Sequence, residues 1–398
     1  MQHASASLRR SPRGGRFDFS RPAHGCSDPI EGYPSLRQTY GLKLKASFRS
    51  RIAGSKVIPH PARFSDCRSR WRSTSNEMDR MAGSGTFTFA SPEDYCAAIR
   101  AGTVNLIVTG GGSFNARLTW LNLGHLHVFR GRENLPRIGF FSLSPAQTFV
   151  SFPTKAGAPL TYGGIGLRFG DLVFHSRGER MHQRIDGEGQ WGLISLPPEQ
   201  LAACSKALTG YNIASPPEGR VLRPPRSAAR RLLGHHSKIC RLAETKHQLI
   251  ANPEVARALE QELIHALVNC LTVGDAGGNL KKRRHHTDIM VRFEDALAAH
   301  DDPHLSLPAL CSEIGVPERT LRACCTEFLG MSPIRYFLLR RLNMVRSALR
   351  RANPANASVA EIARTYQFQE PGRFAVTYRT VFGEMPSSTL RRSLIKTT

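Results

Sequence analysis

An internal duplication near the C-terminal end of the chain constrains its fold more than any other feature. Residues 306–333 read SLPALCSEIGVPERTLRACCTEFLGMSP, and residues 358–386 read SVAEIARTYQFQEPGRFAVTYRTVFGEMP. Apolar, Gly and Pro positions of the first copy recur in the second, at an offset that changes from 52 to 53 residues. The change falls in the turn between two helical patterns, where an insertion is tolerated. The duplication therefore predicts two versions of one helical unit.

Each copy predicts a helix-turn-helix. In the first copy, Ser306 is placed to cap a helix whose apolar residues recur at helical spacing. Gly315 permits a tight turn, and Pro317 suits the start of the next helix, where an N–H would be unpaired anyway. In the second copy, Ser358 is the expected cap and residues 369–371 are the expected turn.

The second helix of each copy leaves an outward face that is rich in Arg, Thr and small residues. Such a face offers donors to guanine edges and phosphates, and a helix propped by another helix fits the major groove of DNA. We therefore predict contacts to DNA bases from Glu318, Arg319, Arg322, Thr326, Gly372, Arg373 and Val376. We predict contacts to DNA phosphates from Arg340, Arg341 and Arg379.

A specific set of residues runs through both copies and the segment between them. It comprises Leu321, Gly330, Ser332, Pro333, Tyr336, RRLNMVRSALR (340–350), SVAEIA (358–363), Phe368, Pro371, Phe374, Phe382, Gly383 and Pro386. In this order, the set resembles the AraC/XylS family of bacterial transcription regulators over about the last quarter of the chain. The chain departs from the family at Gln367 (usually Gly), Cys325 (usually Phe) and Pro317 (usually Ser). The resemblance implies a long helix over 336–351 that sets the two reading helices one DNA turn, ~34 Å, apart.

The order of elements predicts an α+β multidomain protein, with a β-barrel or sandwich-like sensor domain followed by an all-α domain that holds both helix-turn-helix modules. Residues 81–225 contain many short apolar runs broken by Gly, Pro and Asn, which favours a sandwich or barrel. Residues 226–272 are expected to be helices and 273–286 a flexible basic linker. Residues 287–398 are the expected DNA-binding domain, with Thr287 capping its first helix.

Two features of this organisation stay open. The apolar stripe of residues 253–272 fits an internal core or a dimer seam, because members of the family often dimerise through helices at this position. Residues 1–80 are rich in Arg, Ser, Pro and Gly and are expected to be disordered. They fit a DNA-binding arm, an organelle transit peptide, or a translation start at Met78 or Met81.

The charge of the chain points to a polyanionic partner. The net charge is +24, and residues 305–398 hold 14 basic against 6 acidic residues. We expect double-stranded DNA as the partner, and a cytoplasmic location with association to the nucleoid when the protein is bound to DNA. No apolar run of ~18 residues exists, so that no membrane span is expected. The other partners that we consider are RNA polymerase, an unknown effector in the β-rich domain and a second copy of the chain. A helical bundle that binds no DNA is the alternative for the duplicated region.

No cofactor, metal or enzymatic activity is predicted. His125, His127 and Glu133 loosely resemble a cupin metal run, but ordinary strand residues explain them better. No G-x-S-x-G hydrolase motif occurs, and none of the nine cysteines stands in a CxxC pair. Cys325 is expected in the core, with Cys324 partly exposed. The functional alternatives are a DNA-repair alkyltransferase with an AraC-type DNA-binding half, and a protein that binds nucleic acid without sequence choice.

Overall fold

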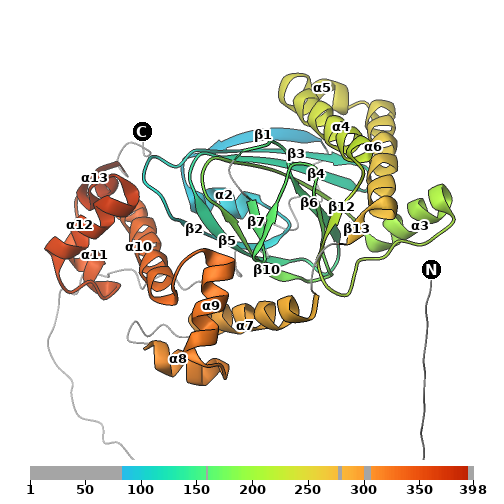
Figure 1. The fold of residues 1–398 in the computed structure, drawn as a ribbon. Helices are drawn as coiled ribbons and strands as arrows, with labels where there is room; N and C mark the ends of the chain where they lie inside the picture. The colour runs from blue at the N-terminus through green and yellow to red at the C-terminus, as the bar shows by residue number, and fades with distance from the viewer. Residues whose placement is uncertain (1–82, 158–159, 277–279, 300–305, 393–398) are drawn as a thin grey trace, which may run out of the picture. The chain divides into compact units, whose positions relative to one another are not determined.

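The computed structural model describes residues 83–157, 160–276, 280–299 and 306–392, which all lie in one compact unit of the chain. The expectations for residues 1–80 fall outside the described residues. In order along the chain, two antiparallel sheets come first, then helices that cover one sheet, and then the helices of the duplicated region (Figure 1). The predicted fold class is confirmed.

The first sheet has eight strands. In spatial order they are β1 (Ser84–Phe89), β3 (Ala116–Leu123), β4 (Leu126–Glu133), β11 (Gly189–Leu196), β6 (Thr148–Pro153), β9 (Leu172–Phe174), β12 (Arg220–Arg223) and β13 (Asp275–Ala276). The second sheet has five strands: β2 (Gly102–Val108), β5 (Arg137–Leu143), β10 (Arg180–Ile185), β7 (Leu160–Tyr162) and β8 (Ile165–Leu167). Their inward-facing side chains form one core between the sheets, as the short alternating runs of the sequence require.

Helices cover part of the outer face of the first sheet. They are α3 (Pro198–Thr209), α4 (Arg226–Thr245), α5 (His247–Ile250) and α6 (Pro253–Val273), while α2 (Pro92–Ala98) packs beside β2 and β3 with Ser91 as its cap. The apolar stripe of α6 packs against α4 and the sheet, and Leu263, Leu267 and Cys270 are fully buried there. Of the two uses considered for this stripe, the internal core is the one that the structure shows.

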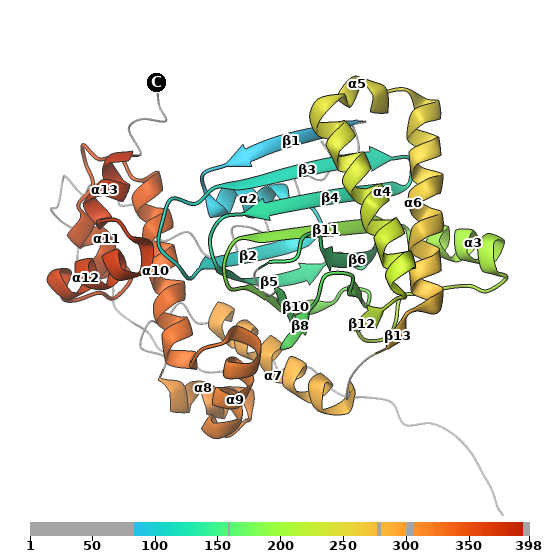
Figure 2. The same ribbon diagram turned by 45° about the horizontal axis from the view of Figure 1, so that its top comes forward.

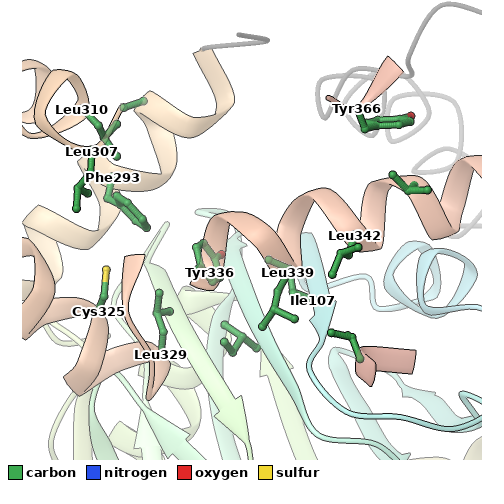
Figure 3. Close-up of a cluster of buried hydrophobic side chains, with 14 of the residues drawn as sticks. Ile107, Phe293, Leu307, Leu310, Cys325, Leu329, Tyr336, Leu339, Leu342 and Tyr366 are labelled. Carbon is green, nitrogen blue, oxygen red and sulfur yellow. The ribbon is translucent and has the colours of Figure 1, made fainter. Parts of the chain in front are cut away.

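The C-terminal helices form a second core. They are α7 (Leu280–Ala299), α8 (Leu307–Ile314), α9 (Glu318–Leu329), α10 (Pro333–Arg351), α11 (Val359–Thr365), α12 (Pro371–Phe382) and α13 (Pro386–Arg391). Figure 3 shows part of this core, with Phe293 of α7, Leu310 of α8 and Tyr336 of α10. Ile107 of the second sheet also joins it, beside Leu342.

The predicted linker over 273–286 is wrong in its second half, because α7 begins at Leu280. Thr287 is therefore an interior residue of α7 and not its cap. The segment that follows the glycines at 277–278 is rich in Lys and Arg, which have good helix propensity. A helix that is already anchored by Ile289, Met290 and Phe293 extends readily through such residues.

Candidate nucleic-acid interface

The first module consists of α8 and α9, and local sequence signals explain its shape. The Ser306 hydroxyl accepts a hydrogen bond from the amide of Ala309 at 3.3 Å, which caps α8. Gly315 ends α8 in the left-handed conformation with φ of 67°, where a side chain would be strained. Helix α9 then buries Leu321, Cys325 and Phe328.

The outward face of α9 carries the four predicted base-contacting residues of this module. Arg319, Arg322 and Thr326 are exposed, and Glu318 is partly exposed. Nε of Arg322 donates to Glu318 at 2.7 Å, so that the two side chains hold each other across one helical turn. Hydrogen-bond donors are therefore available over two turns of α9.

The second module consists of α11 and α12 and repeats this arrangement with two differences. Between its helices, Gln367 has a φ of 62° and is the one non-glycine residue with positive φ among the described residues. This is the position where the AraC/XylS family usually has Gly, and a left-handed backbone explains that preference. Arg341 compensates by donating to the carbonyls of Tyr366 and Gln367, the latter at 2.7 Å. Ser358 precedes α11, but its side chain makes no capping hydrogen bond.

The outward face of α12 presents the predicted residues of the second module. Gly372, Arg373 and Arg379 are exposed. Val376 is 67% exposed, which is unusual for a large apolar side chain on a helix that buries Phe374 and Tyr378. Exposure of Val376 in the middle of a polar face suits a contact with the methyl group of thymine.

Two residues that the sequence predicts to contact phosphates, Arg340 and Arg341, do not lie on the exposed faces of the modules. Arg340 is buried, and its Nη1 donates to Oε2 of Glu294 at 2.8 Å. Arg341 is half-buried against Phe368, with its guanidinium 4.5 Å from the ring centroid, and its donors serve the turn of the second module. Both arginines therefore support the helices. Among the predicted phosphate contacts, Arg379 is the one whose side chain is exposed.

Glu294 is the centre of a buried polar cluster at the base of α10. It accepts from the Tyr336 hydroxyl at 2.5 Å and from Arg340, and Nε2 of His182 on β10 lies 2.9 Å away. Burial raises the pKa of Glu294, but these hydrogen bonds and the positive charge of Arg340 outweigh burial and hold that pKa at about 2. Sequence analysis missed this cluster, although one signal was present: a glutamate directly beside Phe293 on the apolar side of a helix.

The interior of the two sheets holds a second set of buried polar residues. Nε of Arg137 donates to Glu133 at 2.7 Å, and Glu133 also accepts from Tyr95 and Trp191. Glu133 is thus committed to an internal ion pair. Among the described residues, no group of three His, Cys, Asp or Glu side chains could hold a metal ion.

A Ser–His–Glu arrangement also lies between the sheets. Ser151 Oγ is 2.8 Å from Nε2 of His175, whose Nδ1 is 2.8 Å from Glu179. Ser151 is buried in the middle of β6, and its backbone is paired with β11 and β9. Because neighbouring backbone amides are used in the sheet, they cannot form an oxyanion hole at this serine. The arrangement therefore satisfies buried polar groups.

A cavity of about 210 Å³ lies where the ends of the two sheets meet, lined by residues that include Pro153, Leu160 and Ile185. Of the described cysteines, Cys96 and Cys204 are partly exposed and the other five are buried. Cys324, which the sequence predicts to lie partly at the surface, is fully buried like Cys325.

Among the helices of the described residues, none is long and apolar enough to cross a membrane.

Comparison with known proteins agrees with this geometry. A family model described as a helix-turn-helix domain matches residues 310–392. A probable thc operon regulatory protein of Rhodococcus erythropolis is 37% identical over 97 residues, which are 24% of this chain and 29% of that protein. A XylDLEGF operon transcriptional activator of Pseudomonas putida is 38% identical over 93 residues, which are 23% of this chain and 28% of that protein. The chain thus spans less than a third of the length of these relatives.

Two solved structures also match at low similarity. The AraC-like transcriptional activator CuxR has a TM-score of 0.36 and 16% identity, over 65% of this chain and 94% of that chain. ToxT from Vibrio cholerae has a TM-score of 0.25 and 10% identity, over 73% of this chain and 98% of that chain.

Two helix-turn-helix modules on either side of one long helix define a class of DNA-binding transcription regulators. Helix α10 is that long helix here, and the family match at residues 310–392 begins in α8 and ends just after α13. Over residues 310–392, the C-terminal region of this chain matches a helix-turn-helix domain, and it resembles the AraC/XylS family there. The comparisons give no support to a repair alkyltransferase.

Proposed function

We propose that this chain is a sequence-specific transcription regulator that inserts α9 and α12 into successive major grooves of one DNA duplex. The observation that carries the proposal is the duplicated exposed face. Each recognition helix buries one side in a helix-turn-helix core and presents arginines on the other. Helix α10 lies between the modules, and its 19 residues span about 28 Å, close to one turn of DNA.

The two faces use different chemistry. On α9, Arg319 and Arg322 are suited to the acceptor pair of guanine, and Glu318 fixes Arg322 or accepts from cytosine. On α12, Arg373 supplies a donor and Val376 supplies an apolar contact. Thr326 and Gly372 complete the two faces, and Gly372 lets the duplex approach the start of α12. Arg379 contacts a phosphate.

The β-rich region supplies the regulation in this proposal. The cavity between the ends of the two sheets supports an effector site in that region. A second copy of the chain and RNA polymerase are the remaining partners of the proposed regulator. Binding of RNA polymerase is tested by adding it to the protein–DNA complex, and dimerisation by the sedimentation coefficient of the free protein. A monomer in sedimentation excludes the second copy.

The DNA function is tested by selecting bound duplexes from a random pool and comparing the selected and random duplexes at one salt concentration. We expect a ratio of dissociation constants of ~10³ or more, which is typical of specific regulators. A ratio near one favours binding without sequence choice and contradicts the proposal.

Matched variants then assign the contacts. Arg319→Ala should weaken the binding free energy for the selected site by about 1–3 kcal/mol and relax the preference at one base pair. Arg379→Ala should weaken all duplexes alike and reduce the salt dependence. Arg168→Ala, an exposed arginine of the β-rich region, is the control that should change neither quantity.

A further inference from the structure

The outer face of the first sheet carries a row of polar side chains that the proposed DNA contacts do not use. Thr88, Arg117, Arg132 and Gln190 lie directly opposite one another on β1, β3, β4 and β11. Opposite residues on neighbouring strands share a face of the sheet, and the alternate residues of these strands line the core between the sheets. We call these four residues the outer row, and each of them is exposed or partly exposed.

Helix α4 covers the neighbouring row but not the outer row. Thr119 and Arg130, one row away, both donate to Glu244 of α4. Gly192 lies in that same row beneath His236 of α4, because a Cβ there would approach the His236 ring at 2.9 Å. Figure 2 shows α4 crossing one part of this face and leaving the other part of β1, β3 and β4 without a helix above it.

The outer row concentrates positive charge. Arg117 and Arg132 are cross-strand partners, so that two like charges lie directly opposite each other, an arrangement that is destabilising by itself. Arg130 lies in the next row, and Arg241 is exposed on α4 one turn before Glu244. Burial raises the pKa of Glu244, but bonds from Arg130 and Thr119 and the charges of Arg130 and Arg117 lower it overall. One carboxylate therefore faces several arginines.

Buried donors in the same place lack an acceptor. Nε of Arg132 and Nε of Arg130 are inaccessible to solvent and have no hydrogen-bond partner among the described residues. A buried donor that stays unpaired costs roughly 1–3 kcal/mol. These buried Nε atoms are out of reach of a ligand that binds from solvent. The repulsion between the paired guanidinium groups of Arg117 and Arg132 is what a bound anion would relieve.

We infer that the outer row binds a small oxyanion, a carboxylate or phosphate group, on the face of the sheet beside α4. Arg117 and Arg132 are its forked donors, because the planar guanidinium matches both groups with two parallel hydrogen bonds. Thr88 and Gln190 are the neutral polar neighbours of the two arginines in the row. Two arginines favour a doubly charged ligand over a singly charged one.

The test is thermal unfolding of the full chain with inorganic phosphate and with citrate, against sodium chloride at equal ionic strength. We expect phosphate or citrate to raise the melting temperature by at least about 2 °C in a saturable way. The rise should disappear in Arg117→Gln/Arg132→Gln and persist in Arg231→Gln, an exposed arginine elsewhere on α4. An equal rise in the double variant, or an equal rise with chloride, overturns the inference.

The double variant also reports on its own folding and on DNA. Without added anion at low salt, it should melt at or above the temperature of the unchanged protein, because a like-charge pair is gone. Melting far below that temperature would show that the arginines are structural and would contradict the inference.

The slope of DNA affinity against salt should be the same in both proteins. A decrease of about 2 in that slope would assign the row to duplex phosphates instead and overturn the inference. The thermal measurement uses no DNA. It therefore tests anion binding even if the proposed DNA function is wrong.

Discussion

Glu294 and its neighbour Asp295 provide a matched test of how the base of α10 is held. Both lie on α7 and both pair with an arginine, but the Glu294 side chain is 5% exposed and the Asp295 side chain is 55% exposed. Glu294 is bonded to Tyr336 and Arg340 inside the protein, whereas Asp295 meets Arg180 at the surface, with 2.8 Å between Nη1 and Oδ2. We predict that Glu294→Gln and Asp295→Asn have very different effects on stability.

The magnitude follows from the pKa. Folding lowers the pKa of Glu294 from 4.5 to about 2, and this shift is equivalent to about 3 kcal/mol of stability at neutral pH. Glu294→Gln also leaves Arg340 buried without its counter-charge, and breaking one side of such a pair costs roughly 3–5 kcal/mol. Asp295→Asn removes an exposed pair, which contributes about 0–1 kcal/mol.

The assay is urea denaturation of the protein at pH values between 7 and 3, with unfolding monitored by circular dichroism. Because the pKa of Glu294 is lowered on folding, its contribution is present above pH ~4.5 and is lost as the pH falls toward 2. The difference between the unchanged protein and Glu294→Gln should therefore shrink with acid. Equal losses in the Gln and Asn variants, or a difference that is independent of pH, would refute the reasoning.

Three further outcomes are expected. Gln367→Gly should stabilise the protein by about 0.5–1 kcal/mol in the same urea assay, since relief of a left-handed backbone, roughly 1–2 kcal/mol, exceeds the entropy cost of Gly. Gly383→Ala should do the opposite, because Gly383 ends α12 with φ of 69°; equal signs for the two would contradict the backbone argument. Among the described cysteines, iodoacetamide at pH 8 should spare Cys240 in the native protein, because burial raises its pKa to about 12; mass spectrometry that finds Cys240 labelled before Cys204 would contradict this.

Local signals were enough to predict the duplicated modules. Ser306 and Gly315 act within a few residues of themselves, and the structure places both where capping and turn rules require. Pro317 lies at the N-cap of α9, one residue before the predicted first turn. These local signals do not predict which residues far apart in the sequence come into contact. Arg340 looked like a surface cation of a basic helix, but its partner Glu294 lies 46 residues earlier and the third member of the cluster, His182, comes from a strand.

The outer row shows a similar limit. Alternation along a strand predicts that a residue points outward, but not which strands become neighbours. Arg117 and Arg132 meet because β3 and β4 pair in one register, and Gln190 joins them from a strand far along the chain. Pairing between strands is decided by burial of whole faces, so that a single sequence does not reveal which polar residues it brings together.

In the proposed function, both recognition helices contact one flank of a single DNA duplex. Methylation interference on a selected site measures this directly, because Arg contacts are made at guanine N7. We predict two clusters of interfering guanines about one helical turn, ~10 base pairs, apart on the same face. Arg373→Ala/Val376→Ala should erase one cluster and leave the other. One cluster alone, two clusters on opposite faces, or loss of both clusters together in the α12 variant would contradict the account.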